Sequence, residues 1–451
     1  MYTDDELKEI AIQIIHKLEQ KYNFNESEVF IQSLSQIRGG TVFRTPKEFH
    51  STNRAGCAIR YFNNDKLFFS CFPINSVLNR IENLDKQSTY PIETQSFSFP
   101  QITEDSKSIA NIYDKRIASL DEEDFFAIIY ALNEQDEQIK NVILDSSVTY
   151  SLERKIIVNS SNMLAFEKGT WFDIDVRALY RGKDIIASSE KYLTSRQIPN
   201  SLDGLIDDLM SETIQSAATR AKISNLIVPV VFSPNAFADI FSFSFIPLLC
   251  KNEKISTGNY DFSSDFTLVD DGTIPGLPNS TAFDDEGQNQ SKTVLIKNGD
   301  FVNELNSTQF SKDQGIQTGN SFRVKLFEQF PRHYKVYPAI NPSNLLISEG
   351  NETIGELFND VGEGIYVNSV QGHMTADSQT GVFKISTTDA HWIENGSIKG
   401  TLPSFCITGN MLELLEGDTQ FSKDRKVVRP RNTPYSIVLP YILTNKVSIF
   451  S

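Results

Sequence analysis

The sequence predicts an α+β fold built from two regions of different character. Up to about residue 225, amphipathic helical segments alternate with short runs rich in β-branched and aromatic residues. From about Phe262 onward, Gly, Asn, Asp and Thr separate short strand-like runs. We therefore expect an N-terminal and central α/β region at 1–225, with an antiparallel sheet and packed helices, and a mostly-β region at 226–451, barrel- or sandwich-like.

Length and composition agree with a folded protein of more than one domain. The chain has 451 residues, and about 150 residues per domain gives two or three domains. A hydrophobic content of 39% and a charged content of 22% exclude collagen-like and wholly disordered classes. The 42 Lys and Arg against 58 Asp and Glu leave a net charge of −16, so we expect neither nucleic acid nor a membrane as a partner.

Cysteine content and apolar runs favour a cytoplasmic protein. The N-terminal segment is acidic where a secretory signal would be basic. The longest strongly apolar run, 237–250, has 14 residues and includes Asp239 and Pro247, so it is shorter than the ~20 residues of a membrane helix. No CxxC pair occurs, and the cysteines are too scattered for a disulfide framework: Cys57, Cys71, Cys250 and Cys406.

Hydrophobic periodicity places the elements of the N-terminal part. Apolar residues spaced by three and four over 7–18 predict a helix with one buried stripe. A second helix is expected at 74–84, and the turn-forming residues 63–65 predict a hairpin. The segment near 88–110 lacks periodicity and is a possible internal boundary. Short strands are expected at 29–31, 41–43, 58–62 and 67–69.

The central part continues the same alternation. Ser119 and Glu122 match a capping box, which predicts a helix from Ser119 to about Glu137. Another helix is expected at 202–223, followed by a buried strand at 226–232 in which Pro229 argues against a central place in a sheet. Strands are expected at 141–149, 154–158, 170–180 and 183–188, with a tight turn at 181–182.

In the C-terminal region, Asn395-Gly396 lies between two short strand-like runs and is the clearest hairpin signal of the chain. The apolar segment 435–450 is expected to form a last strand or an interface element.

Local catalytic motifs are missing from the sequence. No histidine is followed by Glu or lies four or five residues from another, so the usual zinc-protease helix cannot form: the histidines are His16, His50, His333, His373 and His391. There is also no GxSxG elbow, no Walker loop and no GxGxxG fingerprint. The hydrolase, NTPase and dinucleotide classes therefore lack local support.

An acidic cluster and one cysteine leave alternatives open. Five carboxylates gather in two short runs at 270–271 and 284–286, and their oxygens could bind a hard cation such as calcium. We favour backbone turns with solvated acids, because Asp-Gly and Pro-Gly are turn dipeptides. Cys406 could pair with His391 or His373 as a nucleophile, but a buried structural cysteine is preferred. For His333, a loop residue is preferred over a ligand.

Four parts of the chain carry motifs in a recognisable order, at 158–160, 270–287, 341–350 and 364–410. Together they resemble the TldD/PmbA family, in the family's order and over most of the chain. The 270–287 segment resembles the opening of the family's C-terminal domain, and 341–350 resembles its SNL-containing segment. The 158–160 segment fits its Asn-Ser element, and further resemblance follows to residue 410. The residues that carry the motifs, expected to be structural or interface positions, are Asn159, Ser160, Asp270, Asp271, Gly272, Gly276, Asp285, Gly287, Asn344, Trp392, Glu394, Asn395, Gly396, Gly409 and Asn410.

The resemblance also implies a branch of the family. The TldD branch carries an HExxxH zinc helix, and the TldE (PmbA) branch lacks it. Here the corresponding helix, 235–246, contains no His and no Glu, and its only acid is Asp239. The TldD branch also takes a late cysteine ligand, whereas no Cys follows Cys406. The chain is therefore similar to the TldE branch, in which we expect no catalytic or metal-binding residue and no cofactor, with zinc in a TldD-type partner.

These observations give one leading functional hypothesis and two alternatives. The resemblance implies a non-catalytic subunit of a TldD/TldE-like zinc metallopeptidase that degrades or processes unfolded or precursor peptides in the cytoplasm. Its partner would be a TldD-like catalytic subunit in a heterodimer, with a homodimer when the chain is isolated. The alternatives are a self-sufficient homo-oligomeric hydrolase, using Cys406 or the 270–286 acids, and a peptide- or ligand-binding protein with no enzyme partner.

Overall fold

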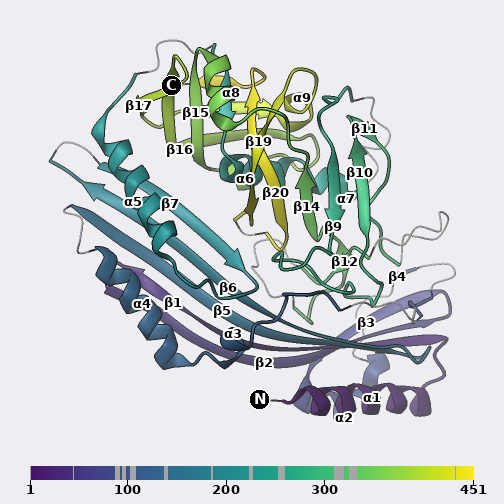
Figure 1. The fold of residues 1–451 in the computed structure, drawn as a ribbon. Helices are drawn as coiled ribbons and strands as arrows, with labels where there is room; N and C mark the ends of the chain where they lie inside the picture. Colours follow the sequence, from purple (N-terminus) through teal and green to yellow (C-terminus); the bar gives the residue numbers. More distant parts are fainter. Residues whose placement is uncertain are drawn as a thin grey trace.

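Two sheets account for most of the described chain, and the N-terminal sheet lies below the C-terminal one in Figure 1. The computed structural model describes residues 2–43, 45–86, 92–93, 98–101, 108–136, 141–183, 186–222, 227–251, 260–308, 319–324, 333–431 and 433–450. The expected domain boundary at 225–226 lies outside these residues, as does most of the possible boundary at 88–110, so both stay predictions.

The N-terminal sheet is antiparallel throughout, as predicted. Its strand order is β4-β3-β2-β1-β5-β6-β7, and every neighbouring pair runs antiparallel. Long central strands give it the curved shape seen in Figure 1. The strands are β1 (Glu26–Val42), β2 (Thr45–Asn63), β3 (Lys66–Pro73), β4 (Ile92–Glu93), β5 (Val142–Asn159), β6 (Leu164–Arg181) and β7 (Ile186–Ser195).

Alternation along these strands sends neighbouring residues to opposite faces, and both faces are buried. On one face, Ile156 and Val158 of β5 pack with the apolar stripe of α1. On the other face, Ile157 packs with Phe283 and Tyr334 of the C-terminal region. Polar side chains on this second face are therefore enclosed between the sheet and the C-terminal region.

The helices cover the first face and one edge of the sheet (Figure 1). The stripe predicted over 7–18 is buried, and Thr3 and Glu6 form a capping box at its start. The helical segments are α1 (Asp4–Lys21), η1 (Ile74–Ser76), α2 (Val77–Arg80), η2 (Ile81–Lys86), α3 (Lys115–Ser119), α4 (Glu122–Asp136) and α5 (Asp203–Ala218).

The predicted N-cap at Ser119 is wrong. Ser119 is the last residue of α3, and Asp121 caps α4 instead. The Asp121 side chain accepts from the backbone N–H of Glu123 at 2.9 Å and of Asp124 at 3.0 Å. Asp124 in turn accepts from the Asp121 N–H at 3.1 Å. The reciprocal pattern of a capping box is thus present two residues later, because Asp is as good a cap as Ser.

The tight turn predicted at 181–182 is wrong, because Arg181 still belongs to β6 and pairs with Ile186 of β7. The other two predicted hairpins are confirmed. Asn63 pairs with Lys66 across a turn in which Asn64 and Asp65 have φ of 50° and 57°. In the C-terminal region, Glu394 pairs with Ser397 across Asn395-Gly396, whose φ values are 51° and 71°. Two successive positive φ values match the twist of the flanking strands, and Asn, Asp and Gly tolerate them best.

The C-terminal region is mostly β, as predicted. Its described strands follow the order β11-β10-β9-β14-β20-β8-β15-β16-β18-β21, while β17 pairs with β16 and β19 with β20. This path closes into no barrel within the described segments. The strands are β8 (Val230–Phe232), β9 (Leu268–Asp271), β10 (Lys292–Lys297), β11 (Asp300–Phe301), β14 (Asn344–Ile347), β15 (Glu363–Gln371), β16 (Val382–Glu394), β17 (Ser397–Thr401), β18 (Cys406–Asn410), β19 (Gln420–Val428), β20 (Ser436–Thr444) and β21 (Ser448–Phe450), with β12 (Ser321–Phe322) and β13 (Ala339–Ile340) paired separately.

The expectation that Pro229 would keep its strand from the centre of a sheet is wrong. β8 lies between β20 and β15 in the interior of the sheet. Pro229 comes directly before the strand, where its missing N–H interrupts no ladder, and its carbonyl accepts from the Ile365 N–H at 3.0 Å.

The core of the C-terminal region is built around α6. Its phenylalanines form a stacked series, with ring centroids 5.6 Å apart for Phe237 and Phe241 and 4.7 Å for Phe241 and Phe245. The helix packs against β15, β19 and β20. No helix in the described segments has the length and apolarity of a membrane crossing. The helical segments here are α6 (Pro234–Ser244), α7 (Ile246–Lys251), α8 (Ile354–Val361), η3 (His373–Thr375) and α9 (Met411–Leu414).

Substitution of Gly272 tests the close packing after β9. A Cβ at this position would overlap Oε1 of buried Gln290 and lie 2.7 Å from its Cδ. Gly272→Val should therefore lower the free energy of unfolding by about 1 kcal/mol or more, measured by urea denaturation. Gly204→Ala in α5 is the control, because its Cβ meets nothing within 4 Å and Ala favours helix. Equal stability of Gly272→Val and the parent would contradict this packing.

Candidate functional site

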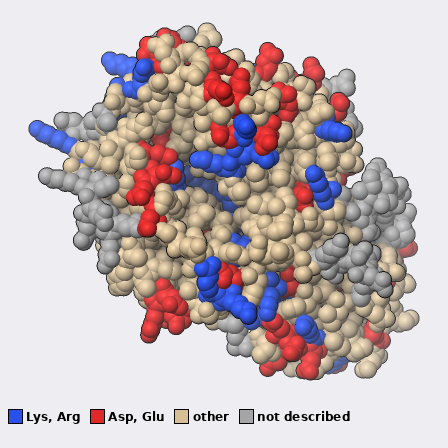
Figure 2. All heavy atoms as spheres, viewed as in Figure 1, with Lys and Arg blue, Asp and Glu red and all other residues tan. Residues whose placement is uncertain are grey.

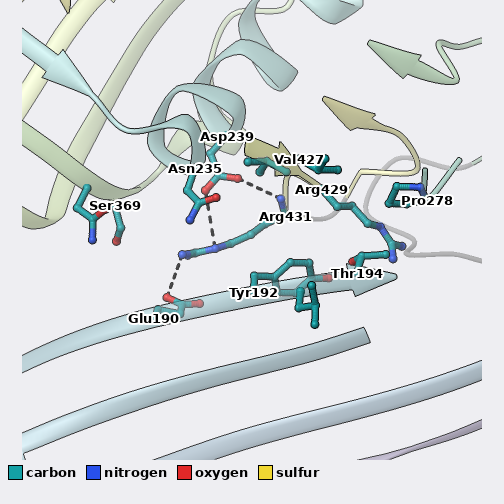
Figure 3. A pocket seen from close by; sticks show the side chains of 13 residues that line it. Glu190, Tyr192, Thr194, Asn235, Asp239, Pro278, Ser369, Val427, Arg429 and Arg431 are labelled. Carbon is teal, nitrogen blue, oxygen red and sulfur yellow. Dashed lines mark hydrogen bonds and ion pairs between the residues drawn. The ribbon is translucent and has the colours of Figure 1, made fainter. Parts of the chain in front are cut away.

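A pocket of about 100 Å³ lies between the free edge of the N-terminal sheet and the C-terminal region (Figure 3). The edge strand β7 lines one wall, and the first turns of α6 line the opposite wall. β15 and the segment from β19 to β20 complete it. The lining residues are Glu190, Tyr192, Leu193, Thr194, Asn235, Asp239, Pro278, Asn368, Ser369, Val427, Val428, Arg429 and Arg431.

Arg431 crosses this pocket and links its two walls. Its Nη2 lies 2.9 Å from Oε2 of Glu190 on β7, and its Nε lies 3.7 Å from Oδ2 of Asp239 on α6. Its backbone N–H donates to Oδ1 of Asp239 at 3.0 Å. Figure 3 shows the guanidinium lying between the strand and the helix. One cation thus compensates carboxylates from both halves of the protein.

Asp239 and Asn235 lie one turn apart on α6 and face the same pocket. Burial raises the pKa of Asp239, and this effect exceeds the opposing effects of nearby His373 and Arg431. The carboxyl therefore keeps its proton more readily than an exposed aspartate would. The Asn235 amide has no hydrogen-bond partner among the residues that the structure describes.

A second cation, Arg429, joins the same two halves. Its Nη1 lies 2.8 Å from Oδ1 of Asp173 on β6, and the guanidinium is almost completely buried. Asp173 also accepts from the Thr194 hydroxyl at 2.8 Å. On the other side of the pocket, Asn368 donates to Asp389 at 2.8 Å, and Asp389 contacts Nε2 of His391 at 2.9 Å.

The C-terminal sequence decides the family to which this architecture belongs. Residues 226–451 match the family model described as "PmbA/TldA metallopeptidase C-terminal domain". The match covers half of the chain. The chain belongs to the PmbA/TldD family.

Individual relatives agree with this assignment. The chain is 24% identical over 398 residues to an uncharacterized protein of Methanocaldococcus jannaschii, covering 85% of this chain and 88% of that protein. It is 30% identical over 158 residues to a metalloprotease of the same organism, covering 35% of this chain and 33% of the relative. The crystal structure of TldE from Thermococcus kodakarensis has the same fold, with a TM-score of 0.84, 20% identity and coverage of 98% of this chain and 100% of that one.

The 270–287 segment of this PmbA/TldD chain forms turns, as expected, but its acids are not solvated. All five carboxylates are buried: Asp270, Asp271, Asp284, Asp285 and Glu286. Turn dipeptides predict the local backbone conformation, but they do not predict which other parts of the chain pack over the turn. Here the second face of the N-terminal sheet encloses the segment and supplies its cations. The acids are held by separate partners, and the described residues contain no group of three or more His, Cys, Asp or Glu that could hold a metal ion.

Arg60 is the centre of a buried ionic cluster between the two halves. Its Nε and Nη2 donate to the carboxylate of Glu28, on the neighbouring strand, at 2.9 and 2.6 Å. Its Nη1 donates to Glu286 at 2.5 Å. Burial alone would raise the pKa of Glu286, but the ion pair with Arg60 and the hydrogen bond from Thr308 lower it overall. Arg323 adds a second cation, with Nη2 3.4 Å from Glu28.

Lys155 on β5, two strands away from Arg60, makes a similar connection. Its Nζ donates at 2.6 Å to the Thr281 hydroxyl and at 2.6 Å to the Phe283 carbonyl. It also lies 3.5 Å from Glu167 and 3.8 Å from Asp285. The motif residue Asp285 thus stabilises the junction between the halves.

Asp270 lies inside the C-terminal region without a cationic partner among the described residues. Its carboxylate accepts from the backbone and hydroxyl of Ser343, at 2.8 and 3.0 Å, and from the amide of Asn320 at 2.6 Å. Burial raises its pKa to about 7 against these hydrogen bonds, which lower it.

Other motif residues make hydrogen bonds in different parts of the structure. Asn159 accepts from the N–H of Ser161 and Met163 within the β5–β6 turn, and the Ser160 hydroxyl accepts from the Ser27 N–H. Asn344 is buried, accepting from the Asn279 N–H at 3.0 Å and donating to the Asp271 carbonyl at 3.0 Å.

The glycines of the motifs allow close approach or positive φ. Gly276 and Gly287 have φ of 76° and 87°, which residues with a Cβ adopt at a cost. At Gly409 a Cβ would lie 2.8 Å from the Phe383 ring. Asn410 caps α9 by accepting from the Leu412 N–H. The β16–β17 hairpin contains four further motif residues, none of which lines the pocket: Trp392, Glu394, Asn395 and Gly396.

The nucleophile alternative finds no geometric support. The Sγ of Cys406 lies 3.7 Å from the Ser386 hydroxyl, whereas His391 contacts Asp389 and Thr401. His373 is buried, and neither of its ring nitrogens has a hydrogen-bond partner among the described residues. The backbone of His333 donates to the Arg323 carbonyl, which keeps His333 in its expected loop role.

Sequence reasoning missed the cations of the site. Arg431, Arg429 and Glu190 belong to none of the motifs, and Arg60 and Lys155 read as ordinary strand residues. One signal was available in the sequence. Five of the nine residues from 423 to 431 are Lys or Arg, although the chain as a whole carries a net charge of −16.

Removal of Arg60 should be strongly destabilising. Arg60→Met leaves buried Glu286 without its cation and leaves Glu28 with only the longer contact to Arg323, which costs about 3–5 kcal/mol of unfolding free energy. Chemical denaturation measures this loss. Lys8→Met is the control, since Lys8 faces the exposed Asp5 at 3.5 Å and exposed pairs contribute little. Similar stability of the two variants would contradict the importance of the buried cluster.

Asp270→Asn should alter how stability depends on pH. The pKa of Asp270 is raised from its unfolded value to about 7, so the native state holds this proton more tightly than the unfolded state does. The resulting stabilisation of the native state is complete below about pH 4 and is lost as the pH rises to 7. The stability of the parent relative to Asp270→Asn should therefore fall by up to ~1.4 kcal/mol per pH unit across this window.

The substitution itself is tolerated sterically. The Oδ1 of buried Asn320 has no partner in the described structure, so a flipped Asn320 amide can accept from the new asparagine. Denaturation at pH 4, 5.5, 7 and 8 gives the difference. A difference that is independent of pH would show that Asp270 titrates normally.

Proposed function

We propose that this chain is the non-catalytic, TldE/PmbA-type subunit of a zinc metallopeptidase pair that acts on unfolded or precursor peptides. The partner is a TldD-type subunit carrying the HExxxH helix and the zinc. The two form a heterodimer, and this chain forms a homodimer when isolated. Family membership and the metalloprotease names of several relatives support the general class.

The observation that carries the proposal is the composition of α6. This is the helix at which the resemblance expects zinc ligands in a TldD-type chain. Here it presents Asn235 and Asp239 to the pocket, and Asp239 is engaged by Arg431. Two imidazoles and a free carboxylate base are the parts that a zinc peptidase site requires. Here the Arg431 guanidinium lies against this helix instead. It supplies a positive charge, but it offers no open coordination position for a substrate.

A metal-free subunit still has a physical role in such a pair. Peptide hydrolysis by zinc needs a shaped cavity that excludes bulk water around the open coordination position. A second chain of the same fold supplies the opposite wall of that cavity. A closed wall also restricts entry to chains without tertiary structure, which fits unfolded peptides as substrates.

Peptidase activity should appear only when this chain is mixed with a TldD-type partner. An unstructured fluorogenic peptide is incubated with each chain alone, with both, and with both plus a chelator. Substitution of the HExxxH glutamate in the partner is the control for catalysis. Chelator-sensitive cleavage by this chain alone would favour the self-sufficient hydrolase, and peptide binding without cleavage in any mixture would favour the binding protein.

Zinc content gives a separate test of the same assignment. Alanine substitutions of His333, His373, His391 and Cys406 should leave the zinc of the purified pair unchanged, because the ligands lie in the partner. Metal analysis of each pair measures this. Loss of zinc in any of these variants that still pairs would place a ligand in this chain and contradict the proposal.

A further inference from the structure

The segment from β19 into the loop before β20 has the opposite charge to the rest of the chain. Residues 420–431 contain five Lys or Arg and one Asp, which gives +4; the remaining residues therefore carry −16 − 4 = −20. Figure 2 shows Lys and Arg atoms along the hollow in the middle of the viewed face. The last part of this segment, 427–431, lines the pocket between the halves.

Two hydrogen-bond donors remain available inside the pocket. Arg431 uses Nη2 for Glu190 and directs Nε to Asp239, while its Nη1 has no hydrogen bond or ion pair among the described residues. The Asn235 amide is likewise without a partner in the described structure. Figure 3 shows Asn235 beside the guanidinium. A guanidinium nitrogen and an amide N–H₂ side by side match the two oxygens of a carboxylate.

The surroundings favour an anion over a neutral group. Asn235 lies in the first turn of α6, an 11-residue helix whose N-terminal end carries partial positive charge. Asp239 and Glu190 oppose an anion, but burial raises the pKa of Asp239 and Glu190 is already bound to Arg431. The volume of about 100 Å³ is well above the ~15 Å³ that one water needs, so the pocket has room for a carboxylate with one or two methylenes.

We propose that this pocket, through Arg431 and Asn235, binds a carboxylate of an extended peptide, from an acidic side chain or from the C-terminus. The inference rests on the proposed function, since it takes the peptide as the ligand. The free edge of β7 forms the floor along which the peptide lies.

Binding to this chain alone tests the proposal independently of cleavage. Three fluorescent peptides of one unstructured sequence are compared by anisotropy: one with a central Asp, one with Asn in its place, and one with Asn and a C-terminal amide. An acidic side chain as the ligand predicts about tenfold tighter binding of the Asp peptide. A C-terminal carboxylate as the ligand predicts that only amidation weakens binding by a similar factor.

Asn235→Asp is the decisive variant. It is nearly isosteric, and an acid in the first turn of a helix is favourable, so α6 should be retained. It should abolish the preference for the carboxylate by repulsion, and Arg431→Lys should weaken it by loss of the planar fork. Lys292→Gln on β10 changes the net charge by −1, as Asn235→Asp does, and as the matched control it should leave binding unchanged. The preference should also fall with rising salt.

Several outcomes would overturn the proposal. These are equal affinity for all three peptides, no binding of any below ~1 mM, or an Asn235→Asp variant that keeps the preference while its melting temperature matches the parent. Because no partner is present, failure here would leave the metallopeptidase subunit assignment intact. Failure of the mixed cleavage assay would likewise leave the binding preference measurable.

Discussion

The architecture depends on charged side chains enclosed between the second face of the N-terminal sheet and the C-terminal region. Arg60 lies there between Glu28 and Glu286, with no solvent exposure for its own side chain. Removal of charges from water is costly, and good geometry with complete hydrogen bonding is needed to compensate for it. The relative position of the two halves is therefore closely defined, since displacement would leave these groups unpaired. The shape of the pocket between β7 and α6 depends on this relative position, because one wall comes from each half.

Local elements were predictable because their signals are local. The Asn395-Gly396 turn requires two positive φ values, and the apolar stripe of α1 is readable from spacing alone. The predictions were wrong where two nearby residues could both cap a helix, and where the exact position of a residue relative to a strand determined its effect. Asp121, two residues after Ser119, is the cap of α4, and Pro229 is compatible with a central strand because it stands just before the ladder.

The site was less predictable, because its residues come together from distant parts of the chain. Arg60 and Glu286 are 226 positions apart, and Arg431 and Glu190 are 241 apart. Period-two alternation places Glu28 and Arg60 on one face, yet only the C-terminal region makes that face buried. For the same reason the acids at 270–287 read as solvated turns, although each is enclosed. The motif resemblance identified residues that hold the halves together, while the lining of the pocket lay mainly elsewhere.

These relationships connect the residues of α6 with the proposed role. Arg431 and Asp239 occupy the wall at which a TldD-type chain is expected to bind zinc, and the same guanidinium contacts the opposite sheet. Anomalous scattering at the zinc edge, from crystals of this chain with a TldD-type partner, tests the central claim most directly. The account predicts one strong peak per pair at the HExxxH helix of the partner and none near α6 of this chain. A zinc peak beside Asp239 or His373 would contradict it.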